Sequence, residues 1–103
     1  MKPHYILTPF GAITRDELEL DKAYELAFIQ HRYRNYPEAV VAGHLTAVVT
    51  EYDYFLGLFS KVASKQSRSQ LSEIANARRI GVAHGKEAAP YRPGFGRDLK
   101  ARK

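Results

Sequence analysis

The sequence predicts an all-α protein: a small bundle of three main helices, with an extended lead-in before them and a basic, mobile tail after them. A chain of 103 residues has room for one domain, and a hydrophobic fraction of 45% is typical of a folded globule. An apolar seam repeats with alternating spacings of four and three residues over 41–62, which is the pattern of a long helix. Capping residues and a proline separate this helix from one before it and one after it.

The N-terminal part is expected to be an extended lead-in over residues 1–13, followed by the first helix. Residues 5–8 (Tyr-Ile-Leu-Thr) favour β structure and a Pro-Phe-Gly turn follows them, which leaves open whether this part forms a strand or lies against the helices. Thr14 and Glu17 have the spacing of a capping box, so the first helix should begin there. A polar and basic stretch predicts its end near Arg34.

The second helix is expected to begin after Pro37, which suits a first helical turn, and to run to about Ala63. A strand over 47–54 is an alternative interpretation, but the length of the seam favours a helix. Its aromatic side chains are expected in the core or at a dimer interface rather than as platforms for bases. The seam consists of Val41, Leu45, Val48, Tyr52, Phe55, Phe59 and Val62.

The third helix is expected to begin at a serine cap, Ser67 or Ser69, and to end at about His84 with Gly85 in the C′ position. Neighbouring helices should be antiparallel and joined by short loops. The stretch after Gly85 combines prolines and glycines with charges, which is typical of a mobile tail. The predicted division is a lead-in over 1–13, a helical domain over 14–85 and a basic tail over 86–103.

The composition excludes several classes of protein. There are no cysteines, so there is no disulfide framework, thiolate zinc site or cysteine nucleophile. No apolar run approaches the ~18 residues of a membrane span, and the first residues lack the apolar core and cleavage site of a signal peptide. We therefore expect a cytoplasmic protein with no membrane association.

The net charge of +5 is concentrated in the C-terminal part of the chain. Residues 61–103 hold eleven Lys or Arg and three acidic residues, whereas acidic side chains predominate in 15–60. Such a basic segment can meet a polyanion such as RNA, and on charge alone a solvated tail without a specific partner is an equal alternative. At the end of the first helix, basic residues alternate with tyrosines, as they do on surfaces that contact RNA. An ordinary helix end explains this pattern equally well. The expected RNA-binding residues are Arg32, Arg34, Lys86, Arg92 and Arg97.

The common catalytic signatures are missing from the sequence: there is no P-loop, no Gly-rich dinucleotide motif, no His-Glu-x-x-His and no nucleophile elbow. The four histidines lie at positions 4, 31, 44 and 84, and no two of them are three or four residues apart. We therefore expect neither a metal site nor a cofactor.

The cluster with the most chemical capability lies at the end of the third helix. Arg79 and His84 form an R-x4-H pattern, and Arg78 adds R-x5-H. A histidine that titrates near neutral pH can move the proton of an RNA 2′-hydroxyl, and an arginine can hold the phosphate as its negative charge develops. RNA supplies its own nucleophile, so this chemistry needs no serine or cysteine.

Residues 77–85 (Ala-Arg-Arg-Ile-Gly-Val-Ala-His-Gly) resemble the R-x4–6-H signature of the HEPN superfamily. Residues 44–56 resemble the helix of that superfamily that carries an acidic residue, here Glu51. The resemblance implies a helical homodimer that is RNA-associated, either a metal-independent endoribonuclease of a defence or toxin–antitoxin system or an inactive binding module. Its implied partners are RNA, a second copy of the chain, and an antitoxin or other protein. The implied roles are acid/base for His84, phosphate clamp for Arg79 with Arg78, and supporting carboxylate for Glu51.

Other interpretations of the same residues stay open. Ideal helix geometry places Arg79 and His84 about 140° apart, so one cleft requires a dimer or a tighter helix near Gly81. His84 can also be an ordinary histidine at a helix C-terminus, and Glu51 an exposed carboxylate. The alternative function is a non-catalytic helical interaction protein, such as a regulator or inhibitor from a mobile element, which binds a protein partner through its aromatic seam or nucleic acid through its tail.

Overall fold

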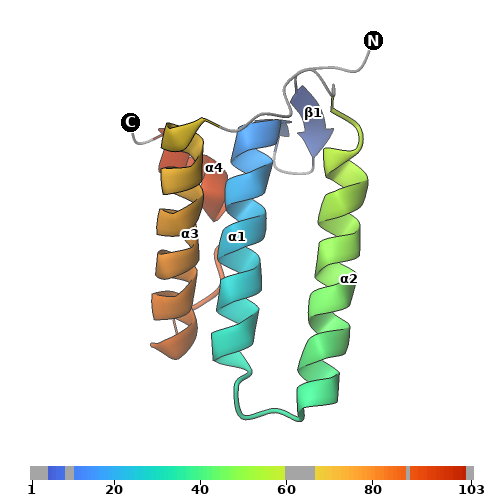
Figure 1. Ribbon diagram of the computed structural model, residues 1–103, viewed down its shortest axis with the longest axis vertical. Coiled ribbons are helices and arrows are strands. Elements are labelled where there is room, and N and C mark those ends of the chain that lie inside the picture. Colours follow the sequence, from blue (N-terminus) through green and yellow to red (C-terminus); the bar gives the residue numbers. More distant parts are fainter. Residues whose placement is uncertain (1–4, 9–10, 60–66, 88, 102–103) are drawn as a thin grey trace.

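The computed structural model describes residues 5–8, 11–59, 67–87 and 89–101, except for the side chains of 97, 100 and 101. The predicted all-α class is confirmed, because three main helices make up most of the described chain. Helix α1 lies in the middle, with α2 on one side and α3 on the other (Figure 1). The elements are β1 (Tyr5–Thr8), β2 (Gly11–Thr14), α1 (Arg15–Arg32), α2 (Glu38–Leu56), α3 (Arg68–Lys86) and α4 (Phe95–Ala101).

The N-terminal lead-in forms a small hairpin, which decides the question that the sequence left open. Strands β1 and β2 pair antiparallel, with Tyr5 opposite Thr14. The inward side chains of Ile6 and Ile13 are buried, so the hairpin closes one end of the bundle. The predicted capping box is confirmed: the Thr14 side chain accepts from the backbone N–H of Glu17, and the Glu17 carboxylate accepts from the N–H of Thr14.

Small residues of α3 allow this helix to pack closely against α1. Ala77 is fully buried. A Cβ added to Gly81 would lie 2.5 Å from the carbonyl oxygen of Tyr24, and one added to Gly85 would lie 2.8 Å from the carbonyl oxygen of Phe28. The three small residues recur every fourth position and therefore share one face of the helix. We call Ala77, Gly81 and Gly85 the α3 stripe.

One prediction about this part of the fold is corrected by the structure. Gly85 does not end the third helix: α3 continues to Lys86, and Glu87 is the C-cap residue. Gly85 instead lies inside the close contact between α3 and α1. Consecutive helices are antiparallel, as expected, and α1 and α3 therefore run in the same direction (Figure 1). Their parallel contact is the most extensive one between elements, because α1 offers the surface that the stripe fits.

The tail that was predicted to be mobile is instead packed over residues 89–101. Phe95 of α4 is 4% exposed, and its ring stacks on Tyr24 of α1 at a centroid distance of 4.6 Å. The next residue, Gly96, donates its backbone N–H to the buried Asp21 carboxylate. The prolines and glycines suggested a loose chain, but they turn it back so that Tyr91, Phe95 and Gly96 reach α1.

Helix α2 differs from the other long helices because none of its residues is buried. Its inner side packs through Tyr52, Phe55 and Leu56 on the small cluster around the hairpin. The helix ends at Leu56 rather than near Ala63, and residues 60–63 lie outside the described part of the chain. Within the described ranges, no helix combines the length and the apolar character that crossing a membrane would require.

Candidate functional site

His84 lies between α3, α1 and α4, where it contacts other rings. Its Nδ1 atom is 2.9 Å from the hydroxyl oxygen of Tyr24, and the tautomer of the imidazole decides which of the two donates. The imidazole also meets the edges of the Tyr24 and Phe95 rings at centroid distances of 5.6 and 5.4 Å. The side chain is only half-buried, so this contact orients it without enclosing it.

The Tyr24 hydroxyl stays protonated beside the imidazole. Burial raises the pKa of Tyr24, while a backbone hydrogen bond from Arg92 and the positive charges of Arg92 and Arg32 oppose the rise. A neutral phenol that holds Nδ1 leaves Nε2 as the nitrogen with no hydrogen-bond partner among the described residues. His84 is therefore an imidazole held in position by Tyr24, with one ring nitrogen outside this hydrogen bond.

The two arginines of the R-x4–5-H pattern do not reach this imidazole. Arg79 is exposed, and its guanidinium donates to the Asn76 side chain at 2.7 Å, one turn earlier on the same helix. Arg78 borders a groove of about 510 Å³ that is lined by residues of all three long helices. Helix α3 is a continuous α-helix through this stretch, so Arg79 and His84, five residues apart, point in different directions.

Arg32 has a structural role that the RNA-binding prediction did not include. Its guanidinium donates to the carbonyl oxygens of His84 at 2.9 Å and Gly85 at 3.2 Å, and to that of Ala89. It also lies over the Phe28 ring, 4.5 Å from the centroid. The carbonyls of His84 and Gly85 belong to the last turn of α3, and that of His84 also accepts from the backbone N–H of Ala89, so Arg32 caps the helix and holds the following segment.

The other basic residues expected to bind RNA have different environments. Arg34 is exposed in the turn after α1 and donates to the carbonyl oxygen of His31. Lys86 is exposed in the last turn of α3. Arg92 lies over the Phe95 ring and forms an exposed ion pair with Asp98 at 3.6 Å. The side chain of Arg97 lies outside the described part of the structure.

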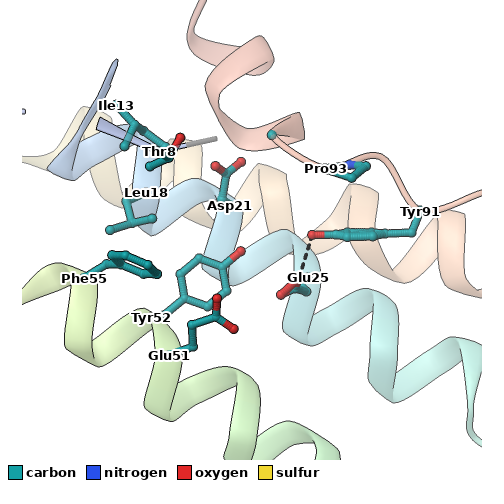
Figure 2. A pocket seen from close by; sticks show the side chains of 11 residues that line it. Thr8, Ile13, Leu18, Asp21, Glu25, Glu51, Tyr52, Phe55, Tyr91 and Pro93 are labelled. Carbon is teal, nitrogen blue, oxygen red and sulfur yellow. Dashed lines mark hydrogen bonds between the residues drawn. The ribbon is translucent and has the colours of Figure 1, made fainter. Parts of the chain in front are cut away.

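Glu51 lies in a pocket of about 410 Å³ between α1, α2 and the segment before α4, and His84 does not line this pocket. Figure 2 shows the carboxylates of Asp21, Glu25 and Glu51 around the Tyr52 ring. Tyr91 closes one side, and its hydroxyl donates to Glu25 at 2.7 Å. The pocket residues come from distant parts of the chain, and their acidic and aromatic types give no periodic pattern in the sequence.

The chemistry of this pocket opposes anion binding. Its lining contains three carboxylates and no Lys or Arg. Burial, reinforced by the neighbouring carboxylates, raises the pKa of Tyr52 and of Tyr91, so both phenols stay neutral and act as donors. Among the described residues, no group of three or more His, Asp or Glu has a geometry that could hold a metal ion. The pocket attracts cations and repels phosphate, and Glu51 has no contact with His84.

A different set of basic residues shares one surface. Arg68, Arg79 and Lys86 of α3 are all exposed. Arg68 and Arg79 are 11 residues apart, and Arg79 and Lys86 are 7 residues apart. Each of these separations corresponds to a whole number of helical turns within about 20°. They therefore follow a line along α3 on the side opposite the α3 stripe. We call these three residues the α3 basic line; the sequence pattern contained it, but only the position of the stripe shows which side of α3 faces outward.

Comparisons of the chain with protein-family models, with curated proteins and with solved structures gave no match.

Proposed function

We propose that this protein is an RNA-associated protein that binds the phosphate backbone through the α3 basic line, in the cytoplasm. The observation that supports this proposal is the exposure of Arg68, Arg79 and Lys86 on one line of one helix. Cations in a row along a rigid helix contact successive phosphates and release counterions when they bind. From Arg68 to Lys86 the helix rises about 27 Å, which is long enough for several phosphates of one strand.

The line also has polar neighbours and a favourable electrostatic background. Exposed Ser72 and Asn76 lie beside it and can donate hydrogen bonds to phosphate or sugar oxygens. The acidic pocket belongs to the α1–α2 side of the molecule, away from the outer side of α3 (Figure 1). RNA would therefore meet positive charge on α3 and negative charge around α2, which orients the molecule on its ligand.

We expect the double variant Arg68→Ala/Arg79→Ala to bind RNA at least about tenfold more weakly than the wild type, because two phosphate contacts are lost. The measurement is fluorescence anisotropy with a labelled single-stranded RNA over a series of salt concentrations. The slope of log K against log salt should become shallower by about 1.4, since each contact with a single strand contributes about 0.7.

The matched control is the double variant Arg15→Ala/Lys22→Ala, which loses the same charge from α1. Both side chains already pair with carboxylates, Arg15 with Glu19 and Lys22 with Asp53. This variant should retain RNA affinity within about twofold of the wild type if phosphate contacts rather than net charge govern binding. Equal losses in both double variants would show that only the net charge matters and would contradict the α3 basic line.

A metal-independent endoribonuclease, as the HEPN resemblance implies, is a second candidate. It is favoured by one observation: the Tyr24 hydroxyl orients His84 and leaves Nε2 for proton transfer. Since Arg79 lies on another side of α3, the active site would need a homodimer that brings Arg79 of one copy to His84 of the other. An antitoxin would then be the protein partner that covers this site.

This candidate predicts that the wild type cleaves RNA in the presence of EDTA and that His84→Ala does not. Gel analysis of labelled RNA after incubation, together with sedimentation of both proteins, measures cleavage and the oligomeric state. His44→Ala, which changes an exposed histidine on α2, is the matched control and should cleave normally. Intact RNA after incubation with the wild type would leave RNA binding as the function and remove the enzymatic candidate.

A further inference from the structure

The pocket between α1, α2 and the segment before α4 has a volume of about 410 Å³ and an apolar end beside the hairpin. Ile13 and Leu18 are buried at this end, and Phe55 packs on the same cluster. A cavity of this size, with apolar walls and a few charged groups, is typical of sites that bind small molecules. The RNA-binding proposal makes no use of this cavity, so its chemistry can be considered by itself.

The acidic side chains of the pocket are displaced from this apolar end. On α1, Glu25 follows Leu18 by seven residues, which is about 10 Å along the helix. On α2, Glu51 precedes Phe55 by four residues, or about 6 Å. Because α1 and α2 are antiparallel (Figure 1), both displacements have the same direction. The pocket therefore has an apolar end and an acidic end, separated by the length of a small organic molecule.

The negative charge of the acidic end has no cation to neutralise it in the described part of the chain. The Glu25 carboxylate accepts from a neutral group, the Tyr91 hydroxyl, at 2.7 Å. Glu51 is exposed, and none of the ion pairs among the described residues includes Glu25 or Glu51. Lys22 of α1 borders the other groove and pairs with Asp53. A positively charged ligand would gain charge-assisted hydrogen bonds here.

Aromatic rings line the same end of the pocket. Figure 2 shows the Tyr52 ring among the carboxylates and the Tyr91 hydroxyl directed at Glu25. The face of a phenol ring attracts an ammonium group, and the attraction grows when the site is partly shielded from water. Burial, together with the charge of Glu25, raises the pKa of both tyrosines, so neither phenol ionises. The rings and the carboxylates therefore favour the same kind of ligand.

Other classes of ligand fit this pocket less well. Within the described ranges, no group of three or more His, Asp or Glu could hold a metal ion. An anion would be repelled by the carboxylates. A linear polyamine would place a second ammonium group among Ile13, Leu18 and Phe55, where it would lose hydration without gaining a carboxylate. An organic cation with a charged end and an apolar end matches both parts of the pocket.

From these observations we propose that the pocket binds a small organic amine, with one ammonium group and an apolar body the size of an aromatic ring system. The ammonium group lies at Glu25 and Glu51 beside the Tyr52 ring, and the apolar body contacts Leu18 and Phe55. The pocket belongs to the α1–α2 side of the molecule, away from the outer side of α3 (Figure 1). The inference therefore goes beyond RNA binding and does not depend on it.

The test uses the full chain and tryptamine, an amine with an indole ring. Since the chain contains no tryptophan, the indole fluorescence of the ligand reports binding without a contribution from protein indole. We expect saturable binding at neutral pH with a dissociation constant of about 100 μM. Tryptophol, which has a hydroxyl in place of the ammonium group, should bind at least about tenfold more weakly. Equal binding of the two compounds, or no saturable binding of tryptamine, would overturn the proposal.

The double variant Glu25→Gln/Glu51→Gln tests the position of the ammonium group. It should raise the dissociation constant of tryptamine at least about tenfold, because both charges are lost. Its binding of uncharged tryptophol should not change, since the amide oxygen at position 25 can still accept from Tyr91 and the pocket stays intact. Loss of tryptophol binding together with that of tryptamine would overturn the role of these carboxylates.

The matched control is Glu38→Gln/Glu87→Gln, which removes the same charge from two exposed positions outside the pocket. This variant should bind tryptamine with the affinity of the wild type. Unchanged tryptamine binding by the pocket variant would show that the amine binds elsewhere. Equal losses in the pocket variant and the control would show that only the net charge matters. Each of these two results would overturn the proposal.

Discussion

Replacing Gly81 by alanine is expected to lower the free energy of unfolding by about 1–3 kcal/mol, the usual cost of inserting atoms into a packed contact. The added Cβ would lie 2.5 Å from the carbonyl oxygen of Tyr24 and 3.1 Å from the Cβ of Ala27. The closest of these atoms belongs to the backbone of α1, so no side-chain rotation relieves the contact and α3 must move away. Urea unfolding followed by circular dichroism measures the loss.

The chain provides a matched control for this substitution in Gly43. It also lies inside a long helix, but a Cβ there would meet nothing within 4 Å. Gly43→Ala should therefore stabilise the protein by about 0.5–1 kcal/mol, the gain from helix propensity alone. Opposite signs for the two variants would establish the close contact of α1 and α3, whereas stabilisation by both would show that α3 does not lie where the structure places it.

Phe95→Ala is expected to have the largest effect of any single truncation in the C-terminal segment, about 3–5 kcal/mol. The Phe95 ring is 4% exposed and contacts Tyr24 and His84. A small domain is stable by about 5–15 kcal/mol in total, so this loss should lower the melting temperature by many degrees. Thermal unfolding by circular dichroism measures it.

Tyr54→Ala is the control for Phe95→Ala, because it also removes an aromatic ring from a helix but at an exposed position. It should change the free energy of unfolding by no more than about 0.5 kcal/mol, as is usual for surface positions. If Phe95→Ala were equally harmless, residues 89–101 would not be part of the core, and the prediction of a mobile tail would stand after all.

The outward sides of α2 and α3, the two outer helices of the molecule, differ in chemical character. The outward side of α3 is basic and polar, while the outward side of α2 carries small uncharged side chains and Tyr54. Helix α1 separates them and carries the core contacts of both (Figure 1).

The candidate site was predicted from sequence only as a set of residue types. The R-x4-H spacing correctly indicated that His84 and Arg79 point apart, because this follows from the helical repeat. It did not reveal that Tyr24 holds His84, or that Arg32 caps α3, since these partners are 60 and 52 residues away in the chain. The acidic pocket around Tyr52 escaped prediction for the same reason: it gathers residues from four separate segments.

The sequence by itself determined the local features of this protein. The capping box at Thr14, a serine cap before α3 and the apolar seam of α2 each depend on residues within a few turns of one another. The sequence left Ser67 and Ser69 open as the cap, and the structure has Ser67. The tertiary structure alone decided the close packing of α3 on α1, the burial of Gly85 inside a helix and the docking of Phe95. These depend on which surfaces meet, and glycine and proline have the same local signature whether they loosen a chain or let it pack closely.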